Sequence, residues 1–168
     1  MRKSTAAIGT TVFFFVAPGM VAGLGPWWVN GWRFSSPAWD PRPVRWVGVA
    51  LIVAGLAVLI ECFARFVNQG RGTPAPPMPT ETLVVSGLYQ YVRNPMYVAV
   101  FTIVVGQGLL FGDVRTLVYA ACVWMGFTIF VMLYEEPTLR RTFGAQYSEY
   151  CAHVGRWWPR ATAWKRGS

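Results

Sequence analysis

The fold of this chain is decided by residues 95–136, PMYVAVFTIVVGQGLLFGDVRTLVYAACVWMGFTIFVMLYEE. Two apolar runs, Pro95–Phe111 and Val114–Tyr134, are separated here by a short turn at Gly112-Asp113. A helix needs about 20 apolar residues to cross a bilayer, with a range near 17–25. Both runs fall within this range, so the sequence predicts an antiparallel hairpin of two transmembrane helices.

Two further apolar runs precede the hairpin, at Ala6–Val29 and Val44–Phe63. The first follows a basic start, but its length and the poor cleavage site at Ala22-Gly23 favour a retained helix over a signal peptide. The sequence therefore predicts an all-α, polytopic membrane protein with about four transmembrane helices.

The composition agrees with lipid as the solvent of this chain. Hydrophobic residues make up 54% and charged residues 13%, whereas soluble proteins carry about 25% charged residues. The net charge of +8 comes from basic residues that flank the apolar runs, which favours membrane orientation over nucleic-acid binding. Four spans place eleven Lys and Arg on the side of both termini and four on the other side, so we expect an integral inner or plasma membrane protein with cytoplasmic termini.

Polar residues collect where the hairpin begins and ends. Asn94-Pro95 is typical of a helix start, whose free backbone N–H groups suit a carboxylate, and Arg93 lies beside it. Because the hairpin crosses twice, Glu135 returns to the same side and can face an ammonium group. A zwitterionic amino acid, such as the one within S-adenosylmethionine, needs both partners. The alternative is an ordinary capped helix, with the carboxylates of Glu135 and Glu136 paired to Arg140 and Arg141.

The C-terminal region is expected to leave the membrane at Pro137. A proline disfavours helical dihedrals in the preceding residue, so we predict a bend at Glu136. An apolar stripe at helical spacing then predicts an amphipathic helix on the cytoplasmic interface. The stripe consists of Leu139, Phe143, Tyr147, Tyr150, Cys151 and Val154. The three cysteines show no C-x-x-C spacing, and no metal site is expected.

At these residues the sequence resembles the isoprenylcysteine carboxyl methyltransferase family and its phospholipid methyltransferase relatives, over about residues 63–160. The resemblance is carried, in order, by Gly87-Leu88-Tyr89, Arg93-Asn94-Pro95-Met96-Tyr97, Glu135-Glu136-Pro137-Thr138-Leu139, Phe143-Gly144-Ala145-Gln146-Tyr147 and Val154-Gly155-Arg156-Trp157-Trp158-Pro159. Each piece alone is a weak signal, but their order around a hydrophobic hairpin is specific.

The resemblance implies an S-adenosylmethionine-dependent methyltransferase whose cofactor site faces the cytoplasm. Together with the helix start, it gives the expected cofactor-binding residues Glu81, Thr82, Leu83, Val84, Tyr89, Arg93, Asn94, Pro95, Met96, Tyr97 and Glu135. The expected organisation is one integrated membrane domain, with a transmembrane helix pair over residues 1–66. Residues 67–168 would hold the cofactor-binding loop, the hairpin and the interfacial helix.

The expected reaction is in-line displacement at the sulfonium methyl, which yields S-adenosylhomocysteine. The acceptor would be lipophilic: an isoprenylcysteine carboxylate, a lipid or a hydrophobic small molecule, with its O, N or S atom left open. The chain has Asn94 where the family usually has His, Ala99 for Gly, Glu81 for His, and Val131 where prenylcysteine-specific members place Arg. The departures at Asn94 and Val131 motivate a second hypothesis, a non-catalytic membrane scaffold. A third, a small transporter, is disfavoured because the span interiors lack ionisable side chains.

Overall fold

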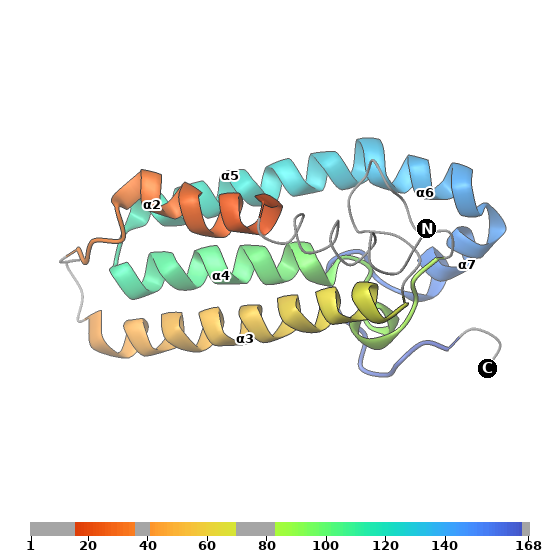
Figure 1. The fold of residues 1–168 in the computed structure, drawn as a ribbon, viewed down its shortest axis with the longest axis horizontal. Helices are drawn as coiled ribbons and strands as arrows, with labels where there is room; N and C mark the ends of the chain where they lie inside the picture. Colours follow the sequence, from red (N-terminus) through yellow and green to blue (C-terminus); the bar gives the residue numbers. More distant parts are fainter. Residues whose placement is uncertain (1–15, 36–40, 70–82, 166–168) are drawn as a thin grey trace. The chain divides into compact units, whose positions relative to one another are not determined.

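The computed structural model describes residues 16–35, 41–69 and 83–165, and all regular structure in this part of the chain is helical (Figure 1). The all-α prediction is therefore confirmed for these residues. The α-helices are α2 (Gly25–Asn30), α3 (Pro41–Gln69), α4 (Pro95–Phe111), α5 (Val114–Phe130), α6 (Glu136–Phe143) and α7 (Ala145–His153). Three helical turns complete the list, the π-helical η1 (Met20–Leu24) and η3 (Val131–Glu135) and the 3-10 helix η2 (Gly87–Gln90).

Two helical stretches are long and apolar enough to cross a membrane, Arg42–Arg65 and Val114–Phe143. They contain the second and fourth predicted spans. Helix α4 has the bounds predicted for the third span, and with 17 residues it is a shorter apolar helix. The predicted first span, Ala6–Val29, begins outside the described residues and is helical from residue 16 onward. The count of four spans stays a prediction.

The helices belong to two compact units, which we describe separately. The first, here called the hairpin unit, comprises Phe14–Leu59 and Met96–Phe127. The second, here called the C-terminal unit, comprises Met1–Phe13, Ile60–Pro95 and Thr128–Ser168. Most residues of the family motifs fall in the C-terminal unit.

Within the hairpin unit, glycines let α3 and α4 approach each other backbone to backbone. A Cβ atom on Gly48 would lie 2.6 Å from the carbonyl oxygen of Gly106, and one on Gly106 would lie 2.7 Å from that of Gly48. A Cβ on Gly55 would lie 2.9 Å from the carbonyl oxygen of Ala99. Lipid gives apolar helices no hydrophobic reason to associate, so small residues that permit close packing stabilise such contacts.

The predicted hairpin of α4 and α5 is confirmed (Figure 1). Gly112 adopts a φ of 67°, which a residue with a side chain rarely adopts, and it reverses the chain between the helices. Asp113 begins α5, and its carboxylate accepts hydrogen bonds from the backbone N–H and the hydroxyl of Thr116 at 3.0 and 2.8 Å. Two ring contacts with centroids 4.8 Å apart mark the antiparallel pairing, Phe101 with Trp124 and Tyr97 with Phe127.

Polar side chains of the hairpin bind the carbonyl groups of η1. Gln107 is buried in α4, where its amide nitrogen donates to the carbonyl of Ala22 at 2.6 Å and its amide oxygen accepts from the Trp32 indole at 3.1 Å. The Tyr119 hydroxyl donates to the carbonyl of Val21 at 2.9 Å. A π-helical turn disturbs the regular α-helical pairing of carbonyls, and these bonds fix η1 against the hairpin.

The predicted bend at Pro137 is wrong, because Glu136 keeps helical dihedrals, with φ −62° and ψ −44°. The helical stretch that begins at Val114 continues to Phe143. The backbone N–H of Glu136 donates to the carbonyl of Val131, five residues earlier, so the wide η3 turn comes just before the proline. Pro137 then stands in the first turn of α6, where a missing N–H is tolerated.

The apolar stripe predicted after Pro137 is buried, but it spans two helices rather than one. Gly144, with a φ of 53°, separates α6 from α7. Tyr147, Tyr150 and Val154 form a core with Trp164. Partly buried apolar residues pack against this core, namely Leu83, Val85, Leu139, Phe143 and Cys151. Protein therefore covers much of this face, and contact of the two helices with a membrane surface stays a prediction.

Candidate functional site

The segment before α4 carries most of the predicted ligand-binding residues, and the C-terminal tail holds its backbone in place. Three hydrogen bonds of 2.9–3.0 Å join the two segments, from Arg93 N to Gly155 O, from Arg160 N to Tyr91 O and from Trp164 N to Gln90 O. All these atoms belong to the C-terminal unit. The tail therefore positions the backbone between η2 and the start of α4.

Tyr89, in η2, is a buried tyrosine of this segment. Its carbonyl accepts a hydrogen bond of 2.6 Å from the hydroxyl of Tyr150, and its side chain hydrogen-bonds with Cys62. Burial raises the pKa of the Tyr89 phenol well above its usual value, and the neighbouring Cys62 and Glu135 raise it further. Tyr89 is therefore uncharged, and the carboxylate of Glu135 lies close enough to act on it electrostatically.

Gly87 lets η2 approach the end of α3. Glu61 and Arg65, four residues apart on α3, form an ion pair with 2.6 Å between Glu61 Oε1 and Arg65 Nε. A Cβ atom on Gly87 would lie 2.5 Å from that carboxylate oxygen and 2.7 Å from that nitrogen. Gly87 also has a φ of 56°. Both the close approach and the backbone conformation therefore require glycine.

Glu136 is a buried acid of the C-terminal unit. Its carboxylate accepts two hydrogen bonds from Arg156, at 2.6 Å from Nε and 2.9 Å from Nη2. Arg93 Nη1 lies 3.0 Å from the same carboxylate. We call these three residues the ion triad. Bonding to Glu136 raises the pKa of Arg156 above its usual value, so all three groups are charged and joined by charge-assisted hydrogen bonds.

Arg93 links the ion triad to α7. Its Nη1 donates to the sulfur of Cys151 at 2.8 Å, while its side chain is only 11% exposed. Its Nε is buried without a hydrogen bond among the residues that the structure describes. Arg93 therefore contacts Glu136 and Cys151 through Nη1, and its Nε remains a donor without a hydrogen bond among the described residues.

Asn94 and Pro95 are both buried at the start of α4. The amide nitrogen of Asn94 donates to the carbonyl oxygen of Arg156 at 3.2 Å. The residue that replaces the usual family histidine therefore binds the backbone of an ion-triad residue. This contact ties the start of α4 to the tail a second time.

The predicted residues are distributed over the chain as follows. The C-terminal unit holds Leu83, Val84, Tyr89, Arg93, Asn94, Pro95 and Glu135. Met96 and Tyr97 belong to the hairpin unit, where Tyr97 packs on Phe127. Glu81 and Thr82 lie outside the described residues.

Sequence reasoning selected Glu135 as the ligand-binding carboxylate, and its alternative paired the carboxylates with Arg140 and Arg141, whereas Glu136 pairs with Arg93 and Arg156. A signal for the structural role of Glu136 exists, because this residue precedes Leu139 and Phe143 by three and seven residues. That spacing places it on the face of the apolar stripe. Glu135 precedes the same two residues by four and eight, so the spacing alone does not separate the two carboxylates, and Glu135 is half-buried in the structure. Across the described ranges, no three His, Cys, Asp or Glu residues are grouped so as to hold a metal ion.

Comparison with known proteins gives one family match. The phospholipid methyltransferase family matches residues 44–146 of this chain. That range contains the whole hairpin, the segment before α4 and the Glu135-Glu136 pair.

Three similar proteins are named as isoprenylcysteine methyltransferases. The protein-S-isoprenylcysteine O-methyltransferase of Schizosaccharomyces pombe is 38% identical over 69 residues, which cover 40% of this chain and 29% of the relative. The O-methyltransferase B of Arabidopsis thaliana is 37% identical over 73 residues, 43% of this chain and 36% of the relative. The enzyme of Rattus norvegicus is 33% identical over 144 residues, 80% of this chain and 48% of the relative. The chain thus spans less than half of the length of each.

Proposed function

Because the chain belongs to the phospholipid methyltransferase family, we propose that it transfers a methyl group from S-adenosylmethionine to a lipophilic acceptor. Its similarity to proteins named as isoprenylcysteine O-methyltransferases supports this function. The observation that supports the proposal is that Tyr89, Arg93, Pro95 and Glu135 belong to one compact unit, in which the Glu135 carboxylate helps to raise the pKa of Tyr89.

The residues of this unit fit the amino-acid part of S-adenosylmethionine. Glu135 would bind the ammonium group, because its carboxylate lies within electrostatic reach of Tyr89, whereas Glu136 already serves Arg93 and Arg156. The unused Nε of Arg93 and the start of α4 at Pro95 would bind the carboxylate. Bound S-adenosylmethionine supplies an electrophilic methyl group on a sulfonium. The protein then contributes position and exclusion of water, because a thioether leaving group needs no acid.

The acceptor would share the membrane with the protein. Val131, where prenylcysteine-specific members place Arg, is only 1% exposed and cannot bind a carboxylate. A carboxylate acceptor would therefore need another cation to bind it, although neither a carboxylate nor a thiolate would need a base. A lipid amine would need a base. An S-isoprenylcysteine carboxylate is the first acceptor to test, because the named relatives act on that group.

We further propose that the protein spans the membrane with its site and both termini in the cytoplasm. The two stretches long enough to cross a bilayer support the membrane location. The excess of basic residues on the side of the termini supports the orientation.

Cofactor binding is the direct test of the proposal. The full chain, purified in lipid nanodiscs, would be titrated with S-adenosylmethionine in a calorimeter. We expect saturable binding that Glu135→Gln weakens about tenfold or more, because a hydrogen bond to a charged group contributes about 1.5–3 kcal/mol. Glu149→Gln is the matched control, since Glu149 is exposed on α7.

Two outcomes would contradict the proposal at different levels. Unchanged affinity in Glu135→Gln would remove Glu135 from the site while leaving the function. Absence of binding at millimolar S-adenosylmethionine by the wild-type chain would favour the membrane scaffold instead. Mass spectrometry after incubation with membrane extract and labelled cofactor would then identify the methylated acceptor.

A further inference from the structure

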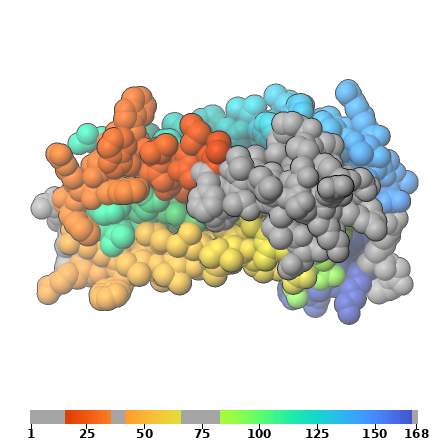
Figure 2. Space-filling model, in the orientation of Figure 1, coloured from red at the N-terminus to blue at the C-terminus, as the bar shows by residue number. Residues whose placement is uncertain are grey.

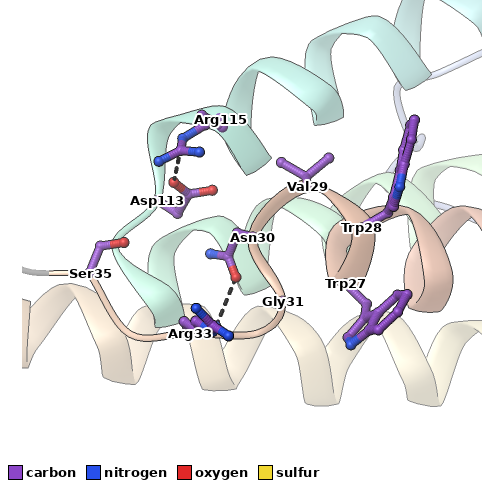
Figure 3. Close-up of a pocket in the computed structure, with 9 residues that line it drawn as sticks. All are labelled: Trp27, Trp28, Val29, Asn30, Gly31, Arg33, Ser35, Asp113 and Arg115. Carbon is purple, nitrogen blue, oxygen red and sulfur yellow. Dashed lines mark hydrogen bonds and ion pairs between the residues drawn. The ribbon is translucent and has the colours of Figure 1, made fainter.

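A concave site lies in the hairpin unit, at the end where α4 stops and α5 starts. It has a volume of about 600 Å³. Figure 3 shows its walls, formed by α2, the turn that follows α2 and the first residues of α5. The residues that matter for its chemistry are Trp27, Trp28, Asn30, Arg33, Asp113 and Arg115. We call this site the hairpin pocket.

The backbone around the hairpin pocket is fixed by hydrogen bonds. Gly31, with a φ of 65°, ends α2, and its N–H donates to the carbonyl of Trp27 at 2.6 Å. The N–H of Arg33 donates to the Asn30 side chain at 2.9 Å. The N–H of Ser35 donates to the carbonyl of Phe111, the last residue of α4, at 2.7 Å. Hydrogen bonds therefore hold the backbone segments that form the walls of the pocket in place.

The hairpin pocket carries an excess of positive charge. Its carboxylate, Asp113, is buried and already accepts two hydrogen bonds from Thr116. Although burial favours the neutral acid, the Thr116 bonds hold the pKa of Asp113 below its usual value. Arg115 lies 3.8 Å from it with a side chain that is 82% exposed. Two exposed arginines, Arg33 and Arg115, thus face the pocket against one internally bound carboxylate, which favours an anion.

Two exposed indoles indicate where that anion comes from. Trp27 is 52% exposed and Trp28 is 86% exposed, and the space-filling view has the orange segment of α2 on the surface (Figure 2). The pocket lies where α4 and α5, both strongly apolar, meet at their turn. Tryptophan prefers the level of lipid headgroups, where its apolar ring and polar N–H are both satisfied. A soluble anion needs no such aromatic wall.

We propose that the hairpin pocket binds the phosphate headgroup of an anionic phospholipid, with Arg33 and Arg115 on the phosphate and Trp27 and Trp28 beside its glycerol and upper acyl chains. The chemistry is that of guanidinium groups with phosphate oxygens, which form bidentate, charge-assisted hydrogen bonds. The site is separate from the proposed methyl transfer and does not depend on it.

Native mass spectrometry of the delipidated full chain tests the proposal. The chain in detergent would be titrated with phosphatidylglycerol, with phosphatidylcholine and with inorganic phosphate. We expect at least fivefold tighter binding of phosphatidylglycerol than of phosphatidylcholine. The double variant Arg33→Gln/Arg115→Gln should lose that preference, and both side chains are exposed, so the fold should remain.

The control removes the same charge elsewhere. Arg42→Gln/Arg141→Gln changes two exposed arginines that do not line the pocket and should keep the lipid preference. If this control loses the preference for phosphatidylglycerol equally, net charge alone explains the preference and the proposal is overturned. An unchanged preference in Arg33→Gln/Arg115→Gln would overturn it as well. Displacement of phosphatidylglycerol by millimolar inorganic phosphate would assign the pocket to a free anion and overturn the lipid as its ligand.

Discussion

Two adjacent carboxylates, Glu135 and Glu136, have opposite environments although they share one motif. Glu136 is 7% exposed and accepts hydrogen bonds from Arg156 while pairing with Arg93. Glu135 is half-buried at the end of η3, within electrostatic reach of Tyr89. A carboxylate that already serves two guanidinium groups has little left for a ligand. Glu136 therefore acts as structural support, and Glu135 is the carboxylate that we propose to bind an ammonium.

The ion triad predicts a large loss of stability in Glu136→Gln. The amide would leave the largely buried Arg93 and the half-buried Arg156 without their counter-ion, and breaking a buried pair costs about 3–5 kcal/mol. For a chain of this size, that corresponds to a melting temperature roughly 6 °C or more below that of the wild type. Thermal unfolding in detergent, followed by circular dichroism, measures it.

The matched control for that variant is Glu149→Gln, whose side chain is exposed on α7. Its melting temperature should stay within about 1 °C of the wild type, because surface substitutions cost little. Equal melting temperatures for Glu136→Gln and Glu149→Gln would mean that the ion triad does not stabilise the fold.

Gly87 gives a second prediction at the residue scale. Gly87→Ala would force a left-handed residue to carry a side chain, which costs about 1–2 kcal/mol. It would also place a Cβ 2.5 Å from Glu61 Oε1. We expect a lower melting temperature and weaker cofactor binding, because η2 carries Tyr89.

Gly126→Ala is the control for this change. Gly126 lies within α5 and has no atom within 4 Å of an added Cβ. The alanine should keep or slightly raise the melting temperature, since it favours a helix over glycine by about 1 kcal/mol. A Gly87→Ala variant that behaves like Gly126→Ala would show that η2 tolerates a side chain at this position.

At the scale of the elements, the sequence predicted those helix bounds that depend on nearby residues. The bounds of α4 follow from Pro95 at its start and Gly112 after its end. The prediction of a bend at Pro137 was wrong, because the wide η3 turn precedes the proline and the helix continues through it. No residue type in Val131–Glu135 predicts a π-helical turn. Gly144 could have been read as a break, but the continuous apolar stripe outweighed it. The long-range contacts of the tail with residues 90–93 have no local signal at all.

The start of α5 predicts a pH dependence. Asp113 has a pKa below its usual value in the folded chain, and the unfolded value is about 3.9. Its carboxylate therefore stabilises the fold above about pH 4, and this contribution is lost as the pH falls through the folded-state pKa. Asp113→Asn should melt below the wild type at pH 7, by a difference that shrinks toward pH 3. A difference that stays constant over this range would exclude the titration of Asp113 as its cause.

At the scale of the whole molecule, charge and apolar length together set the expected orientation. The side assigned to both termini has eleven Lys and Arg residues and the other side has four. Arg93 and Arg156 are held by Glu136 inside the C-terminal unit. Without these two arginines, the side of the termini still has nine Lys and Arg residues, against four on the other side. The charge bias therefore does not depend on the two arginines that Glu136 holds.

This orientation predicts the outcome of reporter fusions. Alkaline phosphatase, which is active only outside the cytoplasm, should be inactive when fused after Lys165 and active when inserted at Gly112, in the turn between α4 and α5. A fluorescent protein that folds only in the cytoplasm should give the opposite pattern at these sites. Changing Arg33, Arg42 and Arg115 to Gln should leave the pattern unchanged, because it deepens the existing bias. Active phosphatase at Lys165 would place the C-terminus, and with it the Tyr89–Glu135 site, away from cytosolic S-adenosylmethionine.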